Sequence, residues 1–215
     1  MEAIETTPCG EFCRELASAA PTPGGGGASA LAGALAAALG GMVTSLTRDK
    51  KKYEAVQQDM LRLDAELEQL RLRLLALVEE DARAFLPLAA AYRLPSATPV
   101  EKAEKARVME EALYNASLPP LEMLRTTVRV LEALEELAGK GSALAISDVG
   151  VGAALGRAAL QGAILNLYIN AASLQDRKKA DELRGEAEIL LYGGIRKADA
   201  IYEAVENQVN GGEKR

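Results

Sequence analysis

Residues 21–47 read PTPGGGGASALAGALAAALGGMVTSLT and contain no charged side chain. Pro23 and the four glycines at 24–27 interrupt the chain, and the Ala-rich segment 28–47 that follows has the composition of a helix. An uncharged segment of this length could span a membrane, but its residues are mostly Ala and Gly rather than Leu, Ile or Phe. We therefore predict a helix over 28–47 that is buried inside a protein and packs closely against its neighbours.

The next segment, from Tyr53 to Tyr92, predicts a second long helix with one apolar face. Its apolar residues are spaced alternately three and four positions apart, as in a helix that packs lengthwise along a partner. These residues are Met60, Leu63, Leu67, Leu70, Leu74 and Leu77. The same spacing continues to Asp81, where an apolar residue is expected. Leu94-Pro95 should end this helix, because the residue before a proline disfavours helical backbone.

The rest of the chain also predicts helices and no strand. We expect a short helix at 11–20, and further helices over 98–117, from Pro119 onward, from Ser147 or Asp148 to Gln175, and over 179–207. A loop is expected at 139–145. No linker rich in Pro or Ser separates domains. The predicted fold class is all-α, with residues 1–215 forming a single-domain bundle of long antiparallel helices.

The chain contains no histidine, and its only thiols are Cys9 and Cys13. This composition excludes Ser-His-Asp and Cys-His hydrolases, as well as a di-iron site that requires histidine. Two thiols without histidine supply at most half of a tetrahedral zinc site, so we predict no metal site. Acid–base chemistry must then use carboxylates, lysines or tyrosines.

Charge and the first residues indicate the compartment. The net charge is −6, whereas nucleic-acid-binding proteins usually carry a basic excess. The first five residues, MEAIE, are acidic where a secretory signal is basic. We expect a cytoplasmic protein that binds neither nucleic acid nor membrane.

The glycine turn, made of Gly24, Gly25, Gly26 and Gly27, has two interpretations. Backbone N–H groups of successive glycines can approach a ligand closely, and the start of the following helix favours negative charge. The alternative is a tight corner that lets two helices pack together. A Walker loop is excluded, because no Gly-Lys-Ser/Thr follows.

Asp81 also has two interpretations. Burial of an unpaired carboxylate is costly and raises its pKa. Such a residue is tolerated mainly in a structural ion pair with Arg or Lys, or for catalysis.

Two further sets of polar residues are candidates. Asp148, Asn166 and Asn170 share one face of the helix predicted after Ser147, together with small residues. Such a face suits either close helix packing or a ligand with several hydrogen-bonding groups. The run 50–53, KKKY, is either a solvated loop or a source of a cation for a shared cleft. Arg107 is a weaker candidate of the same kind.

Taken together, these residues resemble the cyclodeaminase/cyclohydrolase family of folate one-carbon metabolism. That family includes the C-terminal domain of formiminotransferase-cyclodeaminase and stand-alone methenyltetrahydrofolate cyclohydrolases. The matching positions follow in order along nearly the whole chain: 21–26, 30–35, Met42-Val43, Leu46-Thr47, Lys51 to Tyr53, Asp81, Phe85, Leu94-Pro95, Arg107, Pro120, 147–150, Asn166 to Asn170 and Asp176. One departure is the loop 140–145, KGSALA, which lacks the Asn residues that the family often carries there and so bears on the choice of substrate.

The resemblance implies a helical homodimer with a tetrahydrofolate substrate and no further cofactor. It implies that Asp81 and Asp148 act as acid and base, with Lys51 as their electrostatic partner. Substrate binding is expected from the remaining candidates, which are Gly24, Gly25, Gly26, Gly27, Lys52, Tyr53, Arg107, Ser147, Asn166 and Asn170. Formimidoyltetrahydrofolate cyclodeaminase is the first hypothesis and methenyltetrahydrofolate cyclohydrolase the second. A non-catalytic helical scaffold or folate-binding protein is the third, and it predicts that Asp81 and Asp148 are exposed or ion-paired away from any cleft.

Overall fold

The structure, a computed structural model, describes residues 4–211, so part of the acidic start and residues 212–215 lie outside it. Within that range the chain forms six α-helices, two short 3₁₀ helices and no strand, which confirms the all-α prediction. The α-helices are α1 (Cys9–Leu16), α2 (Gly25–Thr47), α3 (Gln57–Tyr92), α4 (Pro99–Lys140), α5 (Ile146–Ser173) and α6 (Arg177–Val209). The 3₁₀ helices are η1 (Lys51–Val56) and η2 (Ala143–Ala145).

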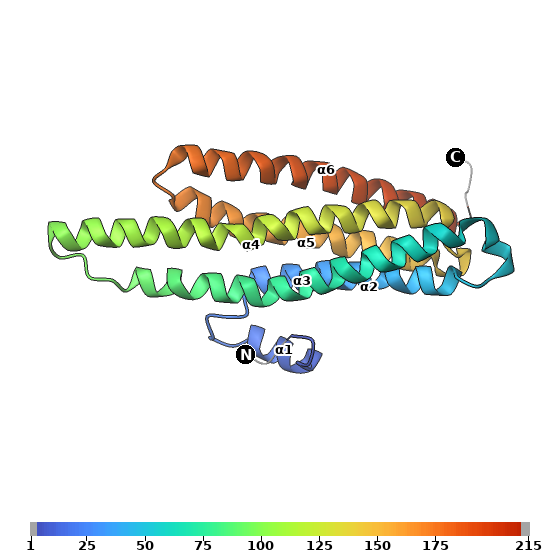
Figure 1. Cartoon of the computed structure of the whole chain (residues 1–215), viewed down its shortest axis with the longest axis horizontal. Coiled ribbons are helices and arrows are strands. Elements are labelled where there is room, and N and C mark those ends of the chain that lie inside the picture. The colour runs from blue at the N-terminus through green and yellow to red at the C-terminus, as the bar shows by residue number, and fades with distance from the viewer. Residues whose placement is uncertain (1–3, 212–215) are drawn as a thin grey trace.

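The five long helices, α2 to α6, lie side by side, and each runs antiparallel to the helix before it (Figure 1). Helix α2 packs against both α3 and α5, and α4 packs against α3, α5 and α6. The short helix α1 lies beside the bundle, where the Ile4 N–H donates a hydrogen bond to Glu79 of α3 (3.1 Å) and Phe12 is buried. The glycine-opened helix is therefore only partly buried, contrary to the prediction, because Leu35, Met42 and Leu46 on its other face are exposed.

The apolar face predicted for α3 is the face that packs into the bundle. All six of its residues, from Met60 to Leu77, are buried. Glycines on the facing helices allow the close approach. A Cβ atom at Gly40 would lie 2.9 Å from a methyl carbon of Leu67, and one at Gly33 would lie 3.1 Å from a methyl carbon of Leu74. Small residues thus let leucine side chains fill the space between helices, in a core with few aromatic rings.

The boundaries predicted at Pro119 and at residue 28 are wrong. The predicted break at Pro119 does not occur, because α4 continues through Pro119 and Pro120 to Lys140. The φ angle of proline suits a helix, so these residues remove hydrogen bonds without ending it. Helix α2 begins at Gly25 rather than at residue 28, so most of the glycine turn forms the first helical turn. By contrast, Thr98 caps α4 as predicted, in a reciprocal capping box with Glu101.

The start of α5 also differs from the prediction. Ala145 precedes the helix and no side chain caps it, so Ser147 and Asp148 lie within the first turn instead. The reason is η2, which leads the chain from the loop directly into helical geometry. In the same way, η1 precedes α3, and α1 ends at Leu16 rather than near residue 20.

Two segments, α2 and Ala143–Ser173, are long and apolar enough to cross a membrane by length and composition alone. Half of the most apolar stretch of each segment is buried against other helices. Core helices of soluble proteins can have the same length and composition. This is weak evidence for a membrane span. The cytoplasmic location stays a prediction.

Candidate active site

The carboxylate of Asp81 lies against the first turn of α2. The apolar spacing of α3 turns Asp81 toward α2, and the carboxylate occupies the space where a Cβ atom of residue 26 would be. Only glycine at position 26 leaves room for it. The backbone N–H of Gly27 donates a hydrogen bond to the carboxylate. Asp81 is therefore held at the positive end of a helix dipole, where negative charge is stabilised.

Burial raises the pKa of Asp81 to about 6, and the hydrogen bond from Gly27 only partly opposes this effect. Among residues 4–211, no Lys or Arg forms a salt bridge with Asp81, although many surface carboxylates in this chain are paired. The structural ion pair considered from the sequence is thus not found. Asp81 can exchange a proton near neutral pH, which is the property required of a general acid or base.

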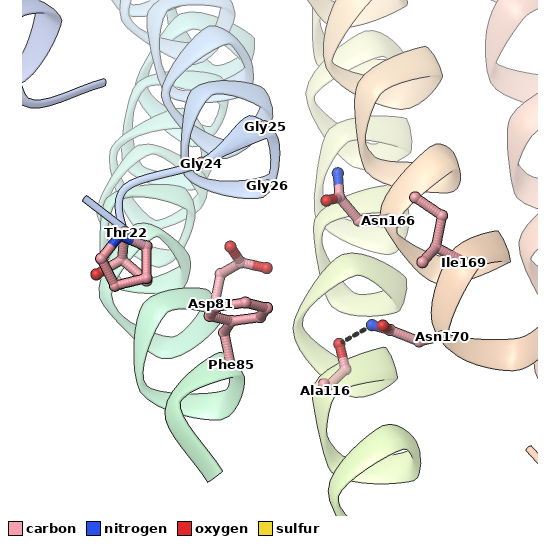
Figure 2. A pocket seen from close by; sticks show the side chains of 11 residues that line it. Thr22, Gly24, Gly25, Gly26, Asp81, Phe85, Ala116, Asn166, Ile169 and Asn170 are labelled. Carbon is pink, nitrogen blue, oxygen red and sulfur yellow. Dashed lines mark hydrogen bonds between the residues drawn. The ribbon is translucent and has the colours of Figure 1, made fainter. Parts of the chain in front are cut away.

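Asp81 lines a cleft with a volume of about 210 Å³ between the start of α2, α3, α4 and the end of α5 (Figure 2). The cleft combines three of the predicted features, namely the glycine turn, Asp81 and the asparagines of α5. Among residues 4–211, no Lys or Arg lines it. The lining residues are Pro21, Thr22, Gly24, Gly25, Gly26, Asp81, Phe85, Ala116, Asn166, Ile169 and Asn170.

Asn166 and Asn170, one turn apart on α5, form the wall of the cleft opposite Asp81 (Figure 2). The Nδ2 atom of Asn166 donates to the carbonyl of Gly162 (3.0 Å), and that of Asn170 donates to the carbonyl of Ala116 (2.9 Å). Asn166 also borders the glycine turn, since a Cβ atom at Gly25 would lie 3.7 Å from its Nδ2 atom. The prediction that both amides share a binding face with the glycine turn agrees with this geometry.

The lysine run lies at the other end of the bundle. Lys51 and Lys52 are exposed in η1, beyond the C-terminal end of α2, which is 23 residues and so about 35 Å long. Tyr53 contacts the loop before α5, where its hydroxyl accepts a hydrogen bond from the Ala143 N–H (3.1 Å). This hydrogen bond lowers the pKa of Tyr53. Within one chain, Lys51 is therefore not a partner of Asp81.

Asp148, Ser147 and Arg107 also lie outside the cleft. Asp148 and Asn166 are on the same helix but 18 residues apart, which corresponds to about 27 Å. Ser147 borders a separate surface groove between α5 and α6. Arg107 is exposed on α4 and pairs with Glu104 (2.7 Å). The sequence grouped these residues with Asp81, but in a single chain they are separated from it.

Several residues of the cleft were not predicted as site residues. Thr22 precedes the glycine turn, Ala116 comes from α4, and Ile169 lies one turn from Asn166. Phe85 follows Asp81 by one helical turn, a spacing that could have predicted its position. Among residues 4–211, no three acidic, Cys or His side chains come together as metal ligands.

Comparison with known proteins agrees with this geometry. The model of the family named formiminotransferase-cyclodeaminase matches residues 8–189. The chain belongs to that family. A methenyltetrahydrofolate cyclohydrolase of Methylorubrum extorquens is 43% identical over 97% of this chain and 98% of its own length. The rat formimidoyltransferase-cyclodeaminase is 31% identical over 91% of this chain, which corresponds to 36% of the rat protein.

The fold of this family member is also found in a solved structure. The crystal structure of formiminotetrahydrofolate cyclodeaminase from Thermotoga maritima superposes with a TM-score of 0.80 at 30% identity. The match covers 97% of this chain and 98% of that chain. The family predicted from the sequence is thus confirmed.

Proposed function

We propose that this protein is a methenyltetrahydrofolate cyclohydrolase, which adds water to the methenyl carbon and opens the ring to give formyltetrahydrofolate. The observation that carries the proposal is an ionisable carboxylate that lines a cleft without a salt-bridge partner, in a chain 43% identical to an enzyme of that name. The sequence alone placed the cyclodeaminase first. The identity over nearly the full length of the cyclohydrolase reverses that order.

Asp81 is the general base in this proposal. Its carboxylate takes a proton from water as the oxygen attacks the cationic methenyl carbon, and it returns that proton to the ring nitrogen whose bond to the carbon breaks. The remaining hydroxyl proton leaves to solvent as the formyl C=O bond forms. A pKa near 6 leaves most molecules ionised at neutral pH, so that the base is available.

The size of the cleft limits which part of the substrate it holds. Its volume of about 210 Å³ is below the range typical of sites that enclose a whole drug-sized ligand. We expect the fused ring system to enter between Phe85 and the asparagines, where one aromatic face and two amides are available. The aminobenzoyl-glutamate portion would then extend toward solvent or a neighbouring subunit.

Formimidoyltetrahydrofolate cyclodeaminase is the second candidate, and the Thermotoga maritima structure favours it because the match covers 98% of that chain. In this reaction a folate nitrogen attacks the formimino carbon and ammonia leaves. A protonated Asp81 could supply the proton that ammonia needs. The two reactions pass through similar tetrahedral carbon centres, so that one cleft could accommodate either.

We further propose a homodimer through the exposed face of α2 and α5. This face is apolar, and α2 carries no charge from Gly25 to Thr47. Such a large uncharged face on a protein surface usually marks an interface. Its exposed residues include Leu35, Met42, Leu46, Val151, Leu165 and Ile169.

An antiparallel two-fold dimer would explain the separation of the predicted site residues. If the axis crosses the middle of α2, then the C-terminal end of one α2 lies beside the glycine turn of the other. Lys51 and Asp148 at that end would then approach the partner's cleft, whose walls lack a cation.

The test is an absorbance assay of methenyltetrahydrofolate with two substrates. Cyclohydrolase activity removes methenyltetrahydrofolate faster than buffer alone, whereas cyclodeaminase activity produces it from formiminotetrahydrofolate. We expect the first, with Asp81→Asn slower by about 10²- to 10⁴-fold and the exposed control Asp181→Asn unchanged. Activity only with the formimino compound would support the second candidate. Activity with neither substrate would support the non-catalytic hypothesis, against which the position of Asp81 in the cleft already argues.

A further inference from the structure

The amide groups of Asn166 and Asn170 are fixed in a way that leaves their oxygens free. Each Nδ2 atom donates to a main-chain carbonyl, as described above. Among residues 4–211, no donor forms a hydrogen bond with either Oδ1 atom. The two oxygens are nevertheless not buried, so a ligand can reach them. Both residues line the cleft, and Figure 2 shows the oxygen of Asn166 pointing across it. Both amides thus present acceptors to a ligand.

The carbonyl that holds Asn170 is available because of a proline. In an α-helix the carbonyl of Ala116 would accept a hydrogen bond from the N–H of residue 120. Residue 120 is proline, which has no N–H, and α4 nevertheless continues past it. The Nδ2 atom of Asn170 provides the missing donor from α5, at 2.9 Å (Figure 2). A flipped amide would set two oxygen atoms against each other, so this contact also determines the orientation of the amide.

We propose that Pro120 is a positioning residue that acts through Asn170 to make this wall of the cleft a hydrogen-bond acceptor. Together with Asn166, Asn170 then offers two acceptor groups to one ligand, on the wall opposite the carboxylate of Asp81 (Figure 2). The ligand edge that suits them carries several N–H donors, as does the 2-amino and ring N–H edge of a reduced pterin. This inference rests on the proposed folate function and names the edge of the substrate that is recognised.

Pro119 provides a matched control within the same helix. It removes the donor to the carbonyl of Asn115, an exposed residue that does not line the cleft. Pro119→Ala and Pro120→Ala each restore one backbone donor to α4, so both should keep the fold. Only Pro120→Ala supplies Ala116 with a second donor that competes with Asn170.

The experiment has one measurement without ligand and one with it. In the ligand-free protein, NMR exchange of the Asn170 side-chain amide should be faster in Pro120→Ala and unchanged in Pro119→Ala. Binding of 5-formyltetrahydrofolate, a stable reduced folate, should be roughly five-fold weaker in Pro120→Ala only, while kcat for methenyltetrahydrofolate stays near wild type. A ligand without the 2-amino group should bind the wild type about ten-fold more weakly than the ligand that has it. Asn170→Leu should bind the two ligands almost equally.

Three different results would overturn three different parts of this proposal. Equal amide exchange in the two proline variants would overturn the link between Pro120 and Asn170, whether or not a folate binds. Equal loss of affinity for the desamino ligand in wild type and Asn170→Leu would overturn the assignment of the recognised edge. Failure of the wild type to bind 5-formyltetrahydrofolate or to turn over methenyltetrahydrofolate would instead contradict the proposed function, and with it the proposed ligand edge.

Discussion

Replacing Asp81 by Asn should change how the stability of the protein depends on pH. The fold raises the pKa of Asp81 from the ordinary value of 3.8 to about 6, so the folded protein holds a proton that the unfolded chain has already released. The free energy of unfolding therefore falls as pH rises between these two values, and the loss is complete above them. At neutral pH the loss is on the order of 3 kcal/mol, and between pH 4.5 and 7.5 it grows by about 2 kcal/mol. Asn cannot ionise, so Asp81→Asn should lack this loss.

The assay is urea unfolding followed by circular dichroism, for wild type and Asp81→Asn at several pH values. Asp181→Asn serves as the control, because its carboxyl is exposed on α6. The difference in free energy of unfolding between wild type and Asp81→Asn should shift by about 2 kcal/mol from pH 4.5 to 7.5, in favour of the variant at high pH. A difference that stays constant over this range would refute the idea that burial holds Asp81 partly protonated.

The remaining predictions concern the packing and the proposed dimer. Gly26→Ala should lower kcat by about a hundred-fold, because its methyl group displaces the carboxylate of Asp81, and steady-state kinetics would detect this. Gly185→Ala meets no neighbour and should instead raise the free energy of unfolding by about 0.5–1 kcal/mol, so destabilisation there would contradict the packing. Leu35→Glu on the exposed face should convert a dimer to a monomer in light scattering, and an unchanged mass would place the interface elsewhere. Asp81→Asn and Lys51→Ala should each be inactive alone. If each site uses both chains, mixing the two variants should restore about a quarter of wild-type activity, because half of the dimers are mixed and each mixed dimer has one intact site. If each site uses one chain, mixing should restore no activity.

Local patterns predicted the parts of the fold that depend on neighbouring residues of one helix. The spacing from Met60 to Leu77 identified the buried face of α3, and its continuation identified Asp81 as a polar group in an apolar position. The spacing of Asn166 and Asn170 likewise placed them on a common face, and both line the cleft. These positions follow from helical periodicity, which is fixed by the backbone.

Relations between helices were less accessible from the sequence. The resemblance to a family grouped Lys51 and Asp148 with Asp81, but it does not specify which end of the bundle each residue occupies or which copy of the chain supplies it. The break predicted at Pro119 failed because the neighbouring helices stabilise α4 across a local defect. The contact between Asn170 and Ala116 joins residues 54 positions apart and has no local pattern.

The most direct test of the account is the pH dependence of kcat/KM for methenyltetrahydrofolate, after subtraction of spontaneous hydrolysis. If Asp81 is the base, kcat/KM should rise with a single apparent pKa near 6 and level off above it, and Asp81→Asn should remove both the rise and most of the rate. A profile of the same shape in wild type and Asp81→Asn, with comparable rates, would contradict the central claim that this buried carboxylate performs the chemistry.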